Sequence, residues 1–124
     1  ILGQHAVYTI RTNQIQKLSQ LSDWQVFISA QLIQNGLKEL GRTEYQFENA
    51  GFTSVYCLAE SHIAIHTWPE LNTVTFDVYL CNYSKNNDDL VVELSNRIVQ
   101  FFEGEIISNQ IPISIFQHSI YKKR

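Results

Sequence analysis

The 124-residue sequence contains no methionine and only two prolines, two cysteines and five glycines. Two cysteines, Cys57 and Cys81, are too few for a disulfide-based scaffold and favour reduced thiols in a cytoplasmic setting. The few glycines form no phosphate-binding loop, and the chain has no repeat or low-complexity stretch. The sequence therefore offers no motif for a separately bound nucleotide cofactor.

Long apolar runs and a surplus of positive charge are also missing. No apolar run approaches the roughly 18 to 20 residues needed to cross a bilayer, and the first twenty residues are too polar for a signal peptide. Twelve acidic and nine basic side chains give a formal net charge of −3. The one basic cluster, Lys122 to Arg124, is expected to be a solvated tail. We therefore expect a cytoplasmic protein that binds neither nucleic acid nor a membrane.

Hydrophobic residues make up 44% of the chain, enough for one domain over residues 1–124. Strands are expected at residues 5–11, 43–49, 52–60, 61–68 and 73–82, with one or two more in the tail from 106 to 121. Apolar spacing predicts a helix from a Ser22–Gln25 capping box through Leu37 and Leu40 to Gly41, and a second over 87–103 before Gly104. This order predicts an α+β two-layer sandwich: an antiparallel sheet with two helices packed on one face.

The strands at 61–68 and 73–82 are predicted to form a hairpin that turns at residues 69–72. The turn would pair Trp68 with Thr73 and, at the other end, Glu60 with Cys81. Alternation then gathers a polar set on one face: Glu60, His62, His66, Thr75, Asp77, Tyr79 and Cys81. The opposite face is apolar: Ile63, Ile65, Val74, Phe76, Val78 and Leu80. Ionisable and aromatic groups on one face favour a site or an interface.

Several kinds of chemistry fit this polar face. His62 and His66 lie about 13 Å apart along a strand, too far to share one zinc ion. A nucleophilic pair of Cys81 with His62 stays open. The structural alternative makes Cys81 a small buried residue and both histidines ordinary strand residues.

The string from Leu58 to Glu70 reads Leu-Ala-Glu-Ser-His-Ile-Ala-Ile-His-Thr-Trp-Pro-Glu. It closely resembles the hallmark of the small prokaryotic S-adenosylmethionine decarboxylases, which are pyruvoyl enzymes. Further matches stand at the family's spacing: Gly3-Gln4-His5 near the start, Phe47 fourteen residues before the serine, Gly51-Phe52-Thr53, and Cys81 twenty residues after the serine. The resemblance thus covers residues 3 to 81.

The resemblance implies a precursor that cuts itself between Glu60 and Ser61. The Ser61 hydroxyl would attack the Glu60 carbonyl to form an ester, and elimination would leave a pyruvoyl group at residue 61. His66 and Thr53 match the family's processing residues. The products would be a β chain of residues 1–60 and an α chain of residues 61–124.

The resemblance also implies an activity: decarboxylation of S-adenosylmethionine, which supplies the aminopropyl donor for spermidine. The pyruvoyl group derived from Ser61 would bind the substrate amine as a Schiff base and take up the charge left at Cα, so no metal or separate organic cofactor is expected. Cys81 matches the proton donor, Phe47 an adenine-stacking residue and Glu70 a residue that binds the ribose hydroxyls. Because the family places its active sites between two protomers, a homodimer is expected.

Other positions depart from the family pattern. Residues 9–13 replace the usual Asp-Leu-Tyr-Gly-Cys, residues 71–75 replace Tyr-Gly-Tyr-Ala-Ala, and Tyr45, Asn49 and Asn82 stand where a histidine, a proline and a glycine are usual. These differences leave two alternatives. In the first, the protein is a pyruvoyl decarboxylase of another amino acid, such as arginine or ornithine. In the second, it is an uncleaved homologue that acts as a regulatory partner.

Overall fold

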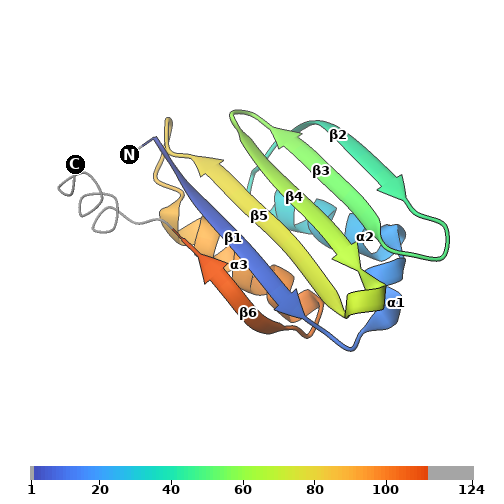
Figure 1. The fold of residues 1–124 in the computed structure, drawn as a ribbon. Helices are drawn as coiled ribbons and strands as arrows, with labels where there is room; N and C mark the ends of the chain where they lie inside the picture. The colour runs from blue at the N-terminus through green and yellow to red at the C-terminus, as the bar shows by residue number, and fades with distance from the viewer. Residues whose placement is uncertain (1, 112–124) are drawn as a thin grey trace, which may run out of the picture.

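Six β-strands form one sheet in which every neighbouring pair is antiparallel (Figure 1). The computed structural model describes residues 2–111. The strand order is β2-β3-β4-β5-β1-β6. The strands are β1 (Gly3–Arg11), β2 (Glu39–Gln46), β3 (Phe52–Leu58), β4 (Ser61–Trp68), β5 (Thr73–Cys81) and β6 (Glu105–Gln110). The helices are α1 (Ile15–Ser19), α2 (Leu21–Gln34), α3 (Asp88–Phe101) and the 3₁₀ turn η1 (Pro69–Leu71).

Helices α2 and α3 cover the same face of the sheet, and within residues 2–111 no helix covers the other face (Figure 1). Both contribute a buried apolar stripe: Trp24, Ile28 and Leu32 from α2, and Val91, Leu94 and Ile98 from α3. These side chains join the inward residues of the strands in one core. Each fully buried aliphatic side chain contributes about 1.5–3 kcal/mol. The predicted α+β two-layer sandwich is confirmed.

The β4–β5 hairpin has the predicted register. Trp68 pairs with Thr73 and His62 with Tyr79, with every intermediate pair in step, but the ladder ends before the predicted Glu60–Cys81 pair. The six residues of the predicted apolar face are at most 2% exposed, namely Ile63, Ile65, Val74, Phe76, Val78 and Leu80. The polar residues of the hairpin are therefore on the face without helices, where a ligand or another chain can reach them.

Helix α2 ends earlier than the spacing of its leucines predicts. Gly36 takes a positive φ of 65°, and the N–H of Leu37 bonds back to the carbonyl oxygen of Leu32 at 2.9 Å. Glycine adopts this left-handed conformation without steric cost, so it ends the helix here. The prediction that Leu37 and Leu40 continue the helix to Gly41 is wrong: Leu37 packs on the core from the connecting segment, and Leu40 belongs to β2.

The start of α2 also differs from the prediction. The helix begins at Leu21, and its N-cap residue Gln20 makes no side-chain capping bond, so the Ser22–Gln25 capping box is wrong. The Gln25 amide instead donates a hydrogen bond to Glu44 on β2 at 2.8 Å. The preceding polar stretch, for which no element was predicted, contains the short helix α1. Leu18 of α1 is fully buried, which explains why this polar segment folds onto the sheet.

At the C-terminal side, α3 begins and ends close to the predicted positions, after Asn87 and before Gly104. Asp88 and Asp89 occupy its first turn, where the helix dipole favours negative charge. Strand β6 confirms the first part of the predicted tail strands, while residues 112–121 and the Lys122 to Arg124 cluster lie outside the described residues. Within residues 2–111, no helix is long and apolar enough to cross a bilayer.

Candidate active site

Ser61 is the first residue of β4 and follows a two-residue turn. The turn, residues 59–60, joins β3 to β4, and Leu58 pairs with Ser61 across it. Glu60 has a φ of 57°, in the left-handed region. That conformation costs a non-glycine residue about 1–2 kcal/mol. The Glu60–Ser61 peptide bond therefore lies in a strained turn, next to the Ser61 hydroxyl.

Cys81 meets this turn from the end of β5. Its N–H donates a hydrogen bond to Ser61 Oγ at 2.9 Å, and its thiol lies 3.8 Å from a carboxylate oxygen of Glu60. Lys38 and Lys85 line the same pocket, whose volume is about 230 Å³. We call it the Ser61 pocket, defined by Lys38, Glu60, Ser61, Cys81 and Lys85. It holds the scissile position, the nucleophile and the proton donor expected from the sequence.

A second pocket lies at the other end of β4. His66 Nδ1 lies 3.0 Å from Thr53 Oγ1, its cross-strand partner on β3. Phe47, Trp68 and Glu70 line the same space, of about 210 Å³, with them. We call it the His66 pocket, defined by these five residues. Sequence reasoning assigned four of them and missed Trp68, although its position two residues after His66 puts both on one strand face.

Within a single chain, the two pockets lie far apart. His66 lies five positions after Ser61 along the extended strand, a distance of roughly 16 Å. A proton cannot pass directly between side chains at that distance, because general acid–base catalysis needs hydrogen-bond contact. Each pocket is also smaller than the roughly 300–1,000 Å³ typical of small-molecule sites. The length of β4 thus divides the predicted site residues between two separate pockets.

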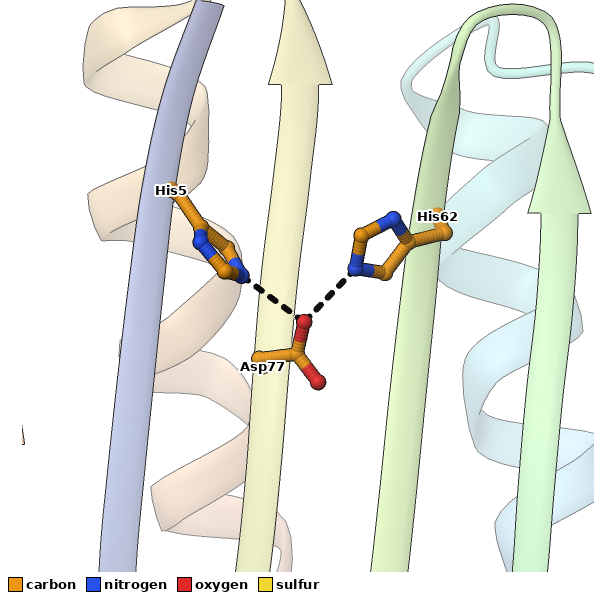
Figure 2. A group of neighbouring side chains, drawn as sticks. All are labelled: His5, His62 and Asp77. Carbon is orange, nitrogen blue, oxygen red and sulfur yellow. Dashed lines mark hydrogen bonds and ion pairs between the residues drawn. The ribbon is translucent and has the colours of Figure 1, made fainter.

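Between the two pockets lies a cluster of His5, His62 and Asp77 on the sheet face without helices (Figure 2). The Nε2 atoms of His5 and His62 contact the same oxygen of Asp77, at 2.8 and 2.6 Å. His62 is therefore engaged with Asp77, and Cys81 contacts Glu60 instead. The open alternative of a Cys81–His62 nucleophilic pair finds no contact to support it among the described hydrogen bonds.

Three neighbouring groups on β2 and β3 have shifted pKa values. The hydrogen bond from Arg42 lowers the pKa of Glu39, and the same bond raises the pKa of Arg42. Burial raises the pKa of Tyr56 to about 12, with a further contribution from the negative charge of Glu44. The Arg42 guanidinium lies 4.4 Å from the centre of the Tyr56 ring. Glu39 and Arg42 lie on β2 and Tyr56 on β3, so the contact of Arg42 with Tyr56 joins two neighbouring strands.

Comparison with known proteins agrees with this geometry. A family described as S-adenosylmethionine decarboxylase matches residues 4–105. The S-adenosylmethionine decarboxylase proenzyme of Methanococcus vannielii is 35% identical over 100 residues, which are 77% of this chain and 78% of that protein. The proenzyme of Aquifex aeolicus is 36% identical over 80 residues, 64% of this chain and 59% of the relative.

Some matches are shorter. The relative from Thermoplasma acidophilum is 39% identical over 62 residues, so the chain spans about half the length of that protein. Among solved structures, the crystal structure of the Aquifex aeolicus adenosylmethionine decarboxylase superimposes with a TM-score of 0.78 at 27% identity, covering 90% of this chain and 88% of the other. The chain belongs to the S-adenosylmethionine decarboxylase family.

Proposed function

We propose that this protein cuts itself between Glu60 and Ser61 and then decarboxylates S-adenosylmethionine through the pyruvoyl group formed at residue 61. The observation that carries the proposal is the Ser61 hydroxyl, held at 2.9 Å by the Cys81 N–H in the strained turn that contains the scissile bond. The relatives are named proenzymes, which describes proteins made as precursors. The product would supply the aminopropyl donor for spermidine.

The proposed cleavage would use groups of the turn at residues 59–60 and Ser61. Ser61 Oγ attacks the Glu60 carbonyl carbon and the peptide nitrogen leaves, so the amide becomes an ester. Loss of the Ser61 α-proton then expels the Glu60 carboxylate and leaves a dehydroalanine. Addition of water to its imine tautomer releases ammonia and gives the pyruvoyl group. Relief of the left-handed Glu60 conformation would favour the forward direction.

Two copies of the chain would complete each active site. The α-proton and the leaving nitrogen of Ser61 need an acid–base group, yet His66 of the same chain is roughly 16 Å away. In a two-fold dimer formed through the faces without helices, the His66 pocket of one copy can cover the Ser61 pocket of the other, and the reverse. Two sites of about 210 and 230 Å³ would then combine into one of ordinary size. The homodimer is part of the proposal for this reason.

In the mature protein, a pyruvoyl carbonyl at residue 61 supplies the electron sink that decarboxylation of an α-amino acid requires. Cys81 would deliver the proton to the substrate carbon, since its thiol lies in the Ser61 pocket beside that position. From the other copy, the rings of Phe47 and Trp68 offer flat apolar surfaces for the adenine. The Glu70 carboxylate can accept hydrogen bonds from the ribose hydroxyls.

Denaturing mass spectrometry tests the cleavage. We expect wild-type protein to give two species, residues 1–60 and residues 61–124, with the second lighter than its sequence because the serine nitrogen has left. Ser61→Ala should give one intact chain. An intact wild-type chain after prolonged incubation would support the uncleaved regulatory partner instead.

Carboxyl-labelled substrates test the activity. Purified cleaved protein should release labelled carbon dioxide from S-adenosylmethionine, and borohydride added with substrate should fix the substrate covalently to the chain that begins at residue 61. Labelled arginine and ornithine are the matched controls. Carbon dioxide release from either of these, and none from S-adenosylmethionine, would leave the proposed self-cleavage intact and show that the substrate is another amino acid.

A further inference from the structure

We propose that His5, His62 and Asp77 form a binding site for a divalent transition-metal ion of the zinc type. The three side chains come from adjacent strands, β1, β4 and β5, and converge on the sheet face without helices (Figure 2). One nitrogen of each histidine and one oxygen of the aspartate lie within 4.8 Å of one another. This proposal goes beyond the decarboxylase function and does not depend on it.

The donor set determines the kind of ion. Two imidazole nitrogens and one carboxylate oxygen suit Zn²⁺, Fe²⁺, Co²⁺ and similar ions, whereas Mg²⁺ and Ca²⁺ prefer oxygen ligands. Both Nε2 atoms already face the same Asp77 oxygen, so small side-chain rotations would place all three donors around a common centre. Each imidazole would then keep its proton on Nδ1. Three protein ligands leave further coordination positions for water or another ligand.

The sheet holds these donors in place before any ion arrives. Tyr79 stands directly between His5 and His62 in the register, paired with both across the ladders. Its ring packs against each imidazole at 5.9 Å, edge-on to His5 and stacked on His62. Neighbouring strands are about 4.8 Å apart, so the two histidines reach over β5 from either side toward Asp77. A site built on three rigid strands costs little conformational entropy to fill.

The cluster is separate from both pockets. None of its three residues lines the Ser61 pocket or the His66 pocket. The side chains are 41%, 40% and 27% exposed for His5, His62 and Asp77, so an ion from solvent can reach them in a single chain. Because the dimer proposed above would cover this face, metal binding should be measured on protein dilute enough to be a single chain, cut or uncut.

The experiment uses full-length protein purified without a histidine tag and stripped of metal with a chelator. Zn²⁺ binding is measured by calorimetry, and Co²⁺ binding by its visible absorption, for wild type and for the variants Asp77→Asn and His5→Gln. His66→Gln removes a histidine of the same sheet face outside the cluster and serves as the matched control. Cys57→Ser and Cys81→Ser control for binding by thiols, Ser61→Ala tests an uncut chain, and Mg²⁺ is the control ion.

We expect one Zn²⁺ per chain, no measurable Mg²⁺ binding, and a Co²⁺ spectrum without the intense near-ultraviolet band of a thiolate ligand. Loss of a residue that binds the metal directly should weaken binding at least as much as loss of a residue that only hydrogen-bonds to such a ligand, which costs about 10- to 100-fold. Asp77→Asn and His5→Gln should therefore each lower the affinity by about tenfold or more, with the control variants and Ser61→Ala unchanged.

Three results would overturn the proposal: no Zn²⁺ binding by wild type, a thiolate band that disappears in a cysteine variant, or affinity unaffected by both cluster variants. Circular dichroism checks that the variants fold. If they do not, X-ray absorption of the zinc-loaded wild type decides, because two imidazoles around the ion support the site and their absence excludes it.

Discussion

The N–H of Cys81 donates a hydrogen bond to the hydroxyl of Ser61, 2.9 Å away, although twenty residues separate them in the sequence. The β4–β5 register brings them together, with His62 opposite Tyr79 as the last ladder pair before this contact. The main chain of Cys81 thus holds the proposed nucleophile, while its thiol lies beside Glu60 and accepts the Tyr83 N–H. Positioning and proton transfer can therefore be separated by mutation.

Replacing the thiol should separate cleavage from turnover. Cys81→Ala keeps the N–H that holds Ser61, so we expect cleavage to proceed in mass spectra. General acid catalysis by a positioned group contributes about 10²- to 10⁴-fold, and carbon dioxide release should fall by a factor in that range. An uncut Cys81→Ala chain would contradict this division and would assign the thiol to processing.

Mixing two inactive variants tests the two-copy site. Ser61→Ala lacks the nucleophile and His66→Gln lacks the acid–base group, so neither should mature efficiently alone. In a mixed dimer, one site combines the Ser61 of one chain with the His66 of the other. Co-expressed chains with distinct tags should therefore show cleavage of the His66→Gln chain only.

Absence of cleavage in the mixture would contradict the shared site, provided that both chains are recovered in one complex. Cleavage of His66→Gln alone at the wild-type rate would remove His66 from the processing reaction.

Gly51 should tolerate no side chain. A Cβ there would overlap the carbonyl and hydroxyl oxygens of Thr67, and that hydroxyl accepts the Phe52 N–H at 2.8 Å. Overpacking of this kind typically costs about 1–3 kcal/mol, and we expect Gly51→Ala to lower the free energy of unfolding in urea by that amount. Gly41→Ala is the matched control, since a Cβ at Gly41 meets nothing within 4 Å. Equal stability of the two variants would contradict the prediction.

Tyr56 should make the fold sensitive to alkali. Its pKa is about 12 in the fold because of burial, against about 10 in an unfolded chain. Below about pH 10 the Tyr56 hydroxyl keeps its proton in the folded and in the unfolded state, so the free energy of unfolding is not reduced. Between about pH 10 and 12 the hydroxyl loses its proton in the unfolded state first, so the free energy of unfolding falls as pH rises. Two pKa units correspond to at most about 3 kcal/mol.

Urea unfolding across this pH range measures the effect. Tyr56→Phe has no proton to lose, so its stability should decline less steeply than that of wild type between about pH 10 and 12. Parallel curves for the two proteins would show that other groups cause the alkaline loss.

The hairpin and its two faces could be predicted because local signals agree there. Pro69 and Asn72 bracket the turn, and Asn72 takes the left-handed φ of 52° that ends it. The alternation of apolar and polar side chains along β4 and β5 then determines every cross-strand pair beyond the turn. The end of α2 could not be predicted in the same way, because Leu37 and Leu40 continue the helical spacing, and the choice of Gly36 as the stop depends on packing of Leu37 in the core.

The division of the site into two pockets could not be predicted from residue types. The motif places Ser61 and His66 five residues apart, which resembles one compact site in the sequence. Only their extended conformation turns five residues into roughly 16 Å. Trp68 and the partnership of His5 with Asp77 were missed because each depends on neighbours that the sequence alone does not place.

The two longest departures from the family pattern, residues 9–13 and 71–75, are neighbours in space. The N–H of Thr12 bonds to the carbonyl oxygen of Asn72 at 2.9 Å, and the Asn72 amide returns a bond to Thr12 at 3.2 Å. Arg11 pairs with Thr73 on the adjoining strands. A change in one segment therefore alters the contacts of the other, so the two differences form one local variation of the fold.

The strand order determines how the two products of a cut after residue 60 would be held together. Strands β1 to β3 would belong to one product and β4 to β6 to the other, yet β1 lies between β5 and β6. The products would be interleaved along three seams, β3–β4, β5–β1 and β1–β6, and could separate only by unfolding the sheet. Once cut, the protein would behave as two chains that refold only by finding each other, so its refolding rate would depend on concentration.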